Sequence, residues 1–282
     1  MDYDEKQYQC GELQAKDADK LKALLELSGK YEALEMKQAF ADEFTGWWYG
    51  AYSNNAIVAT AYITKQFVYL YGRDRDAMLS MGKSMGRSQG KRTTGTTHSV
   101  FGPKDMVQAF WSGFQITDKS VVSDTTLNLN ELTKIECKLN DAYEVRVAGK
   151  KDLLLVFDFM GAALIDELGT DIRRTGKEAH EKYCQQLIES GVVLLGYHRG
   201  KPAFIARYSE TPVGIFIENA YFPTAMKRPK VMRGIHARVG ELLLQKAESV
   251  LIYLDVADTE QQAAFDEVGY RSVSTSRLMR LR

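Results

Sequence analysis

Residues 192–223, VVLLGYHRGKPAFIARYSETPVGIFIENAYFP, decide the fold. Two runs rich in β-branched and aromatic residues, 192–197 and 202–208, flank the polar turn sequence His198-Arg-Gly-Lys201, a pattern typical of a β-hairpin. A third run, 213–222, follows after Glu210-Thr-Pro212 and predicts another strand. The stretch therefore predicts three strands in succession, each joined to the next by a short connection.

The residues on both sides of this stretch alternate between helical and strand patterns. Downstream, apolar spacing predicts a helix within 231–248, a strand at 250–256, a helix at 259–267 and a last strand at 272–280. Upstream, the pattern predicts a strand at 143–147 and helices at 152–168 and 176–189. The second half is therefore an α+β unit with a mixed sheet.

The first half repeats this plan. A helical pattern over 19–44 is interrupted at Ser28-Gly29, a hairpin at 47–62 turns at Asn54-Asn55, and strands at 66–71 and 99–101 alternate with two helices before a last strand region at 117–139. The likeness lies in the order of the elements and not in matching residues. Internal duplication explains it economically, and we predict two domains, 1–140 and 141–282.

The second half, roughly 143–282, resembles the GNAT acyltransferase superfamily. The strands of 192–223 are similar to the family's second to fourth strands, and KRPKVMRGIHARVGELLLQKA (227–247) stands where the family has its pyrophosphate loop, R/Q-x-x-G-x-G/A, and the following helix. The most specific likeness is YLDVADTEQQAAFDEVGYRSV (253–273), which resembles the family's fifth strand and its N-x-x-A-x-x-x-Y-x-x-x-G-F helix. Its matching positions are Asp258, Ala264, Phe265, Gly269 and Tyr270.

The first half resembles the same family more weakly, through element order and FGPKDMVQAFWSGF (101–114), and lacks a recognisable phosphate loop. The resemblance thus implies two tandem GNAT-like domains, with a degenerate first copy. Each would be a mostly antiparallel sheet flanked by helices, with a splay between its fourth and fifth strands. It implies acetyl-CoA or another acyl-CoA as co-substrate, and transfer of the acyl group to an amine of a small molecule or peptide.

The resemblance also implies a site. A carboxylate on the fourth strand is the expected base for the amine, which makes Glu218 the catalytic candidate, although a strand residue that faces outward without a catalytic role explains it equally well. The pyrophosphate would bind at a helix N-terminus, where free N–H groups and the helix dipole favour anions. The implied cofactor-binding residues are Ala220, Tyr221, Phe222, Lys227, Arg228, Lys230, Val231, Met232, Arg233 and Asp258.

Two departures from the family pattern leave an alternative open. Arg228 and Lys230 replace the loop glycines and Pro229 lacks an N–H, so the loop must hold a phosphate through side-chain cations, and a solvated basic loop explains these residues nearly as well. Phe265 stands where many members carry the tyrosine that protonates the leaving thiolate, and a phenyl ring donates no proton. The alternative is a catalytically degenerate scaffold or ligand-sensing protein.

Composition narrows the remaining function classes. The chain of 282 residues has 37 Lys and Arg against 37 Asp and Glu, so its zero net charge argues against a nucleic-acid or membrane-surface binder. The basic stretch 83–92 is a weaker candidate for nucleic acid. Three widely spaced cysteines predict neither disulfides nor a metal site, and a polar, acidic N-terminus without a long apolar run predicts a cytoplasmic protein that does not enter membranes.

Overall fold

The computed structural model describes residues 8–41, 46–64, 67–89, 99–114, 120–168 and 171–281. It divides into two compact units, the first formed by residues 1–129 with 273–282 and the second by 130–272. The predicted boundary at residue 140 refers to where the element order starts again, whereas these units are defined by contacts. The boundary between the two repeats therefore stays a prediction.

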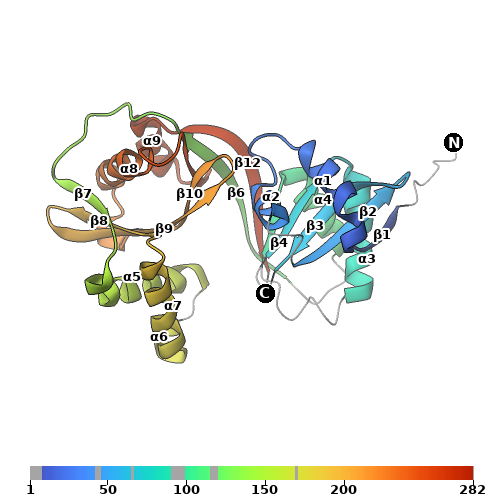
Figure 1. Ribbon diagram of the computed structural model, residues 1–282, viewed down its shortest axis with the longest axis horizontal. Coiled ribbons are helices and arrows are strands. Elements are labelled where there is room, and N and C mark those ends of the chain that lie inside the picture. Colours follow the sequence, from blue (N-terminus) through green and yellow to red (C-terminus); the bar gives the residue numbers. More distant parts are fainter. Residues whose placement is uncertain are drawn as a thin grey trace. The chain divides into compact units, whose positions relative to one another are not determined.

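The first unit contains a sheet flanked by helices (Figure 1). In chain order its elements are β1 (Gln9–Glu12), η1 (Ala15–Asp17), α1 (Ala18–Glu26), α2 (Leu34–Ala41), β2 (Trp47–Ser53), β3 (Ala56–Ile63), β4 (Phe67–Gly72), α3 (Arg75–Gln89), β5 (Ser99–Gly102), α4 (Lys104–Phe114) and β6 (Val121–Leu132). The predicted hairpin turn is present, with Asn54 and Asn55 at φ of 48° and 65°. Asparagine tolerates this left-handed conformation better than most residues.

The second unit repeats the plan (Figure 1). Its elements are β7 (Tyr143–Val147), η2 (Lys150–Asp152), α5 (Leu153–Leu168), α6 (Ile172–Thr175), α7 (Lys177–Glu189), β8 (Val193–His198), β9 (Lys201–Thr211), β10 (Gly214–Tyr221), η3 (Thr224–Met226), α8 (Pro229–Leu243), β11 (Val250–Asp255), α9 (Thr259–Val268) and β12 (Arg271–Leu281). The predicted elements of this half are present to within a few residues at their ends. The sequence patterns did not predict α6, a single turn, or β1 of the first unit.

The last strand of the chain completes the sheet of the first unit. The strand order there is β1-β2-β3-β4-β5-β12, and Arg277 to Arg280 pair antiparallel with Gly102 to Ser99. Met279 and Leu281 accordingly pack into the core of the first unit. In the second unit the order is β6-β11-β10-β9-β8-β7, and Leu132 of β6 packs into that core. The two units thus exchange strand segments, which an order of independent repeats does not predict.

Alternation along the strands assigns each face of the second sheet to different helices. Ile215 and Ile217 of β10 belong to the core that holds residues of α8 and α9, while Ile205 of β9 belongs to the core that holds residues of α5 and α7. Figure 1 shows α8 and α9 on one side of this sheet and α5 to α7 on the other. Because side chains alternate along a strand, each neighbour of these isoleucines in sequence faces the opposite set of helices.

Residue-level matches between the units support the duplication. Asp17 and Asp152 end η1 and η2, are 6% and 8% exposed, and each accepts a hydrogen bond from the backbone N–H three residues before it. The Leu13 N–H donates to the Trp48 carbonyl oxygen, and the Ala148 N–H donates to that of Val193, over 2.9 and 2.8 Å. The duplication is therefore visible in side-chain roles as well as in element order.

The second strand of each unit carries a tyrosine four residues after the carbonyl acceptor, Tyr52 after Trp48 and Tyr197 after Val193. The Tyr52 hydroxyl bonds the Asp17 carboxylate, whereas Tyr197 accepts a 2.6 Å hydrogen bond from Arg146, which in turn pairs with Asp152. Each tyrosine follows a one-residue bulge at the same point, between Ala51 and Tyr52 in the β2–β3 ladder and between Gly196 and Tyr197 in the β8–β9 ladder. Bulges set the local aim of a strand, so their retention preserves the frame of both units.

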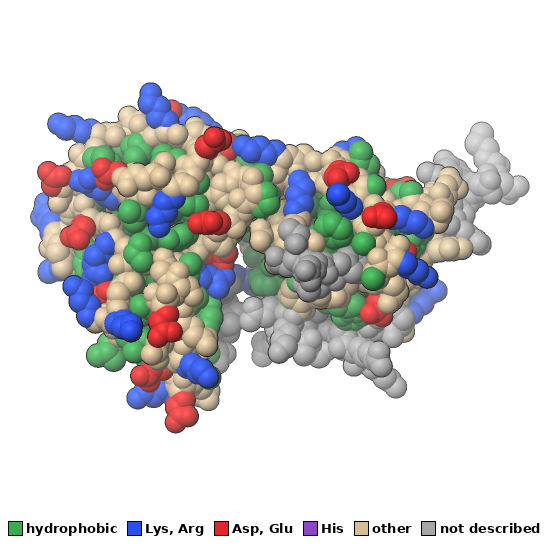
Figure 2. All heavy atoms as spheres, viewed as in Figure 1, with side chains coloured by type: hydrophobic (Ala, Val, Ile, Leu, Met, Phe, Trp, Pro, Cys, Tyr) green, Lys and Arg blue, Asp and Glu red, His purple; other side chains and the backbone are tan. Residues whose placement is uncertain are grey.

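Charges of both signs are interspersed over the face of the molecule shown in Figure 2. This distribution agrees with the balanced composition. Among the residues that the structure describes, no helix is both long and apolar enough to cross a membrane.

Candidate functional site

The candidate site lies where β10 and β11 separate. These parallel strands pair at Ile215–Val250, Phe216–Leu251 and Ile217–Ile252, and within the described residues the ladder ends there. Both strands continue, β10 to Tyr221 and β11 to Asp255. The predicted splay between the fourth and fifth strands is therefore present, and it leaves backbone N–H and C=O groups of β10 without β11 as a partner.

A bulge on β10 shapes the edge of this splay. Glu218 pairs with Arg207 of β9 and Tyr221 pairs with Ile205, so three steps along β10 match two along β9. Asn219, inside the bulge, has a φ of 50°. Asn219 and Ala220 are exposed. The extra residue turns backbone groups out of the ladder at the point where the strands part, which is where the predicted acyl-binding residues lie.

The same bulge decides which side chains face α5 and α7. Phe216 and Glu218 alternate with Ile215 and Ile217 and so face that side. Without the extra residue Tyr221 would face α8 and α9, but it packs against the core of α5 and α7 instead, with its ring 6.1 Å from that of Phe159. Burial raises the pKa of Tyr221, and the nearby Asp166 carboxylate raises it further.

Both carboxylate oxygens of Glu218 have partners on β9. Arg207 forms an ion pair with Oε2, and the Ser209 hydroxyl donates to Oε1 over 2.5 Å. Arg207 also donates to the Tyr183 hydroxyl of α7 over 3.1 Å. The carboxylate side chain remains 23% exposed. Glu218 is therefore oriented by its neighbours and reachable from solvent, and each carboxylate oxygen keeps a lone pair that can accept a proton.

The N-terminus of α8 follows β10 after a seven-residue connection, 222–228. Its cap is Arg228, no side chain caps it in the part of the chain described, and Pro229 is its first residue. The N–H groups of Val231 and Met232 both donate to the Arg228 carbonyl oxygen over 2.9 Å, and no bond from the Lys230 N–H to the described backbone is present. Arg228 and Lys230 are exposed and form no ion pair within the described residues. This helix end is therefore cationic and open to an anion.

Two further predicted cations are tied to α9. The Lys227 Nζ lies 3.6 Å from the Asp258 carboxylate, which also caps α9 by accepting a 3.0 Å bond from the Gln261 N–H. Arg233 forms an ion pair with Glu267. Asp258 thus has a structural role that joins the loop to α9, and Arg233 is partly neutralised. Arg228 and Lys230 remain the cations best placed to meet a phosphate.

The apolar residues of the predicted site lie in the core beneath it. Phe222, Val231 and Met232 are buried at 8%, 5% and 2% exposure, so only their backbone can reach a ligand. Phe265 is also buried and its ring lies 4.1 Å from that of His236. His236 of α8 is fully enclosed, neither ring nitrogen has a partner among the described atoms, and burial lowers its pKa to about 3.

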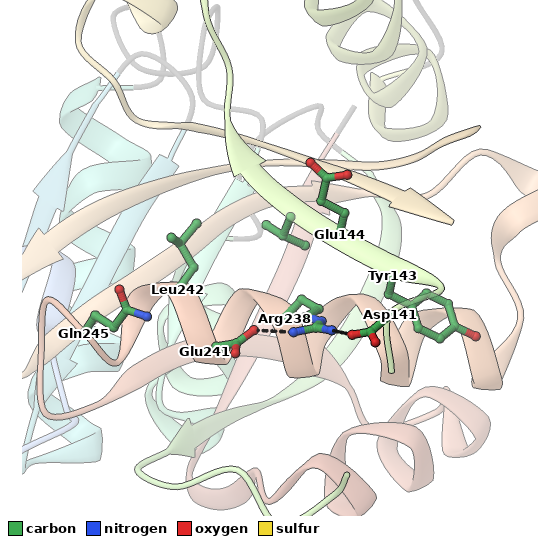
Figure 3. A pocket seen from close by; sticks show the side chains of 8 residues that line it. Asp141, Tyr143, Glu144, Arg238, Glu241, Leu242 and Gln245 are labelled. Carbon is green, nitrogen blue, oxygen red and sulfur yellow. Dashed lines mark hydrogen bonds and ion pairs between the residues drawn. The ribbon is translucent and has the colours of Figure 1, made fainter. Parts of the chain in front are cut away.

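A surface pocket of about 360 Å³ lies elsewhere on the second unit, between α8 and the edge strand β7 (Figure 3). Arg238 points between the carboxylates of Asp141 and Glu241 and pairs with both over 2.8 Å. The positive charge of Arg238 is therefore engaged in ion pairs within the protein. In the strand order β7 stands three places from β10, so this pocket is separate from the splay.

The sequence pattern located the strand and helix end of the site but missed its supports. Arg207, Ser209 and the bulge at Asn219 follow from the register between β9 and β10, which one sequence does not specify. Neither 202–208 nor 213–222 alternates strictly between apolar and polar residues, so an Arg and a Glu on consecutive strands are the one signal that the sequence offered for this pair. Residues 90–98, which include part of the basic stretch, lie outside the described residues.

Comparison with protein-family models gives no match, and neither does comparison with curated proteins. Solved structures do match over both units. A GCN5-related N-acetyltransferase from Sphaerobacter thermophilus is similar with a TM-score of 0.65 at 11% identity, over 98% of this chain and 95% of that one.

Two further solved structures have the same extent of likeness. An acetyltransferase of the GNAT family from Colwellia psychrerythraea is similar with a TM-score of 0.59 at 11% identity, over 97% and 100% of the two chains. A tandem GNAT protein from the clavulanic acid biosynthesis pathway is similar with a TM-score of 0.57 at 10% identity, over 98% of each chain. At such identities the likeness concerns the fold, and each match spans both units in one chain.

Proposed function

The chain has the GNAT fold twice in tandem, as its sequence predicts, and on that premise we propose that its second unit transfers an acyl group from acyl-CoA to a primary amine. One observation carries the proposal. The strand that bulges at the splay is the strand whose connection leads into the uncapped, cationic end of α8. An acyl thioester and a pyrophosphate need those two features at a fixed separation.

The residues of the second unit divide between binding and chemistry. The exposed edge of β10 at Asn219 and Ala220 offers backbone groups to an extended ligand arm, which adds to a strand edge as another strand would. The Lys230 N–H with the side chains of Arg228 and Lys230 would hold phosphates. Tyr221 shapes the edge from the α5 side. Val231, Met232 and Phe222 contribute the buried base under this surface.

In the reaction the amine nitrogen bonds to the acyl carbon, the carbon–sulfur bond breaks, and the products are an amide and the thiol of CoA. Glu218, held by Arg207 and Ser209, would take the proton that the amine loses on a free lone pair of its carboxylate. Donors aimed at the carbonyl oxygen stabilise the charge that develops there. Phe265 supplies no proton, so the departing sulfur takes its proton from another group or from water.

Calorimetric titration with acetyl-CoA and with free CoA tests the binding step. We expect saturable binding of both and a rise in the melting temperature, since a ligand that binds only the native state stabilises it. Absence of heat and of any thermal shift at millimolar ligand would remove the proposal. Asp258→Asn is an informative variant here, because it weakens the tie between Lys227 and α9 without touching β10.

Glu218→Gln then tests the chemical step. We expect turnover to fall by about 10²- to 10⁴-fold, the usual contribution of a positioned general base, with little change in CoA affinity. Glu210→Gln, on the exposed part of β9, is the matched control and should leave turnover unchanged. Unchanged turnover in Glu218→Gln would clear this carboxylate of the base role.

A second candidate function is a ligand-binding scaffold without turnover. The buried Phe265 and the pairing of both Glu218 oxygens favour it. It predicts CoA binding with no thiol release for any amine. Turnover of an acyl-CoA by the purified protein rules it out.

A further inference from the structure

The face of β10 that carries Glu218 contains more aromatic surface than the binding of a thioester requires. Phe216 precedes Glu218 by two residues and faces the same side, and the bulge brings Tyr221 to that side as well. An amine that Glu218 deprotonates must approach over this face. The side chains on this face therefore indicate the chemical class of the acceptor amine. This inference rests on the proposed function.

Two aromatic pairs flank the carboxylate. On one side the Phe216 ring lies edge-on to Tyr253 of β11, with 5.4 Å between centroids and 72° between planes. On the other side Tyr221 lies edge-on to Phe159 of α5, at 6.1 Å and 78°. All four residues are half-buried, so part of each remains outside the core. Edge-to-face pairs of this kind leave ring surface on which another flat apolar group packs favourably.

The charged groups around these rings offset each other. Glu218 is paired with Arg207, whose guanidinium also bonds Tyr183 of α7. Near the Tyr221 hydroxyl the Asp166 carboxylate and the Arg173 guanidinium act in opposite directions, and Arg173 also pairs with Asp171 over 2.8 Å. A substrate with several ammonium groups gains from several uncompensated carboxylates, and a sugar gains from a dense set of polar partners. Among the described residues, the four aromatic rings and the Glu218 carboxylate paired with Arg207 provide neither arrangement.

We infer that the acceptor is a primary amine borne on an aromatic or similarly flat apolar group. Its ring would pack between the pairs Phe216–Tyr253 and Phe159–Tyr221, which places its amino group at Glu218. The exposed bulge residues Asn219 and Ala220 leave the approach to the splay open at the same point.

Thiol release from saturating acetyl-CoA tests this with four amines: 2-phenylethylamine, spermidine, glucosamine and a lysine-containing peptide. We expect 2-phenylethylamine to have the highest kcat/KM. Phe216→Ala should raise its KM about tenfold, the effect of one lost aromatic contact and its buried area, with the KM for acetyl-CoA changed less than twofold. A preference for spermidine, glucosamine or the peptide overturns the inference and leaves the acyl transfer standing.

The matched control is Phe67→Ala in the first unit. Phe67 is also half-buried and packs on one tyrosine, Tyr69, with 5.4 Å between centroids. The Phe67→Ala substitution likewise removes one aromatic contact, at a position far in sequence from the proposed acceptor face. Equal rises of KM in Phe67→Ala and Phe216→Ala contradict a specific role for Phe216.

Ligand-observed NMR can measure the binding of 2-phenylethylamine in the absence of acetyl-CoA. This measurement separates the inference from the proposed function. If acetyl-CoA does not bind, acyl transfer fails, yet amine binding that Phe216→Ala removes still supports the ligand class. If acetyl-CoA binds but 2-phenylethylamine neither binds nor is acylated, the inference is overturned while the CoA site stands. A circular dichroism spectrum of Phe216→Ala confirms that the variant is folded.

Discussion

The two units share a frame and differ at the end of their fourth strand. In the second unit β10 bulges, parts from β11 and reaches α8 through seven residues, 222–228. In the first unit β4 pairs regularly with β3 from Val68 to Gly72 and reaches α3 through two residues, Arg73 and Asp74. The bulge and the long basic connection thus belong to one copy only.

The start of α3 also differs from the start of α8 in charge. The Asp74 carboxylate accepts bonds from the N–H groups of Asp76 and Ala77, over 3.0 and 3.1 Å, and from the Tyr8 hydroxyl over 2.7 Å. An anion is therefore already built into this helix end. Nearby, a Cβ on Gly102 would lie 2.5 Å from the Leu70 carbonyl oxygen, so β5 stays close to β4 beyond their last paired residues. In the described part of the first unit, the end of β4 therefore lies close to β5, and the start of α3 is already capped by a carboxylate.

The features common to both units belong to the duplicated frame, whereas the features proposed for binding are those of the second unit. The buried aspartates Asp17 and Asp152, with their tyrosines and adjacent bulges, recur in both units because they fix the first turn of the first helix against the second strand. The open splay and the cationic helix end occur once.

Arg146 is the one member of the second aspartate cluster that the first unit lacks, because Gly11 stands at its place. It pairs with Asp152 through two bonds of 2.7 and 2.8 Å and holds the pKa of that carboxyl at about 2. Arg146→Ala leaves a buried carboxylate without its cation, and should lower the free energy of unfolding by about 3 kcal/mol. Urea denaturation followed by circular dichroism measures it.

The control for Arg146→Ala is Arg174→Ala. Arg174 pairs with Asp171 over 3.5 Å but its side chain is 85% exposed. Exposed pairs contribute about 0–1 kcal/mol, so this variant should unfold close to the wild type. A loss in Arg146→Ala no greater than that of Arg174→Ala would contradict the role assigned to the cluster.

Arg228→Asp tests the difference between the two helix ends by giving α8 the kind of cap that α3 has. A carboxylate at this position satisfies first-turn N–H groups and repels phosphate, so CoA affinity should fall about 30-fold, or about 2 kcal/mol. Calorimetry with free CoA measures it. Lys201→Asp, in the exposed hairpin turn, changes the net charge by the same amount and should leave the affinity within twofold.

The two units should respond to acid in opposite directions. Burial raises the pKa of the Glu35 carboxyl on α2 to about 7, so the native first unit holds a proton that the unfolded chain releases above about pH 4.5, and its stability falls between pH 4.5 and 7. Burial lowers the pKa of His236 to about 3, so the unfolded chain binds a proton that the native second unit excludes below about pH 6.5. Acidification from pH 7 to 5 should thus stabilise the first unit and cost the second about 2 kcal/mol.

All three tryptophans, Trp47, Trp48 and Trp111, lie in the first unit. Tryptophan fluorescence during urea denaturation therefore follows that unit, and hydrogen exchange of peptides from 193–268 follows the second. Glu35→Gln should flatten the pH dependence of the first signal, and His236→Phe that of the second. The same sign of pH dependence in both signals would contradict the assignment.

Much of the architecture could be predicted because the strand and helix patterns are local. The hairpin turns at Asn54-Asn55 and Arg199-Gly200 were predictable from turn chemistry, and the start of α9 from the cap Asp258. The exchange of β12 was not predictable from those patterns, because Met279 and Leu281 alternate equally well for either sheet.

The site could be predicted only in outline. Sequence position identified β10 and the start of α8, but the pairing of Glu218 with Arg207 and the orientation of Tyr221 depend on one bulged residue. A one-residue shift of register moves side chains to the other face, and no local pattern in 213–222 specifies it. The matching roles of Asp17 and Asp152 were hidden for a similar reason, since their tyrosine partners lie 35 and 45 residues further along the chain.

The smallest expected effect separates the two aspartate clusters. Tyr52→Phe removes a hydrogen bond from buried Asp17, which keeps the bond from the Gln14 N–H, and should cost about 1 kcal/mol. Tyr197→Phe leaves the two bonds between Arg146 and Asp152 in place, so its cost should be less than half as large. Thermal unfolding of the two variants measures the difference, with fluorescence for the first unit and hydrogen exchange for the second. If Tyr197→Phe lowers stability more than Tyr52→Phe does, Asp152 depends on its tyrosine as Asp17 does. Arg146 would then not have taken over the role of the tyrosine.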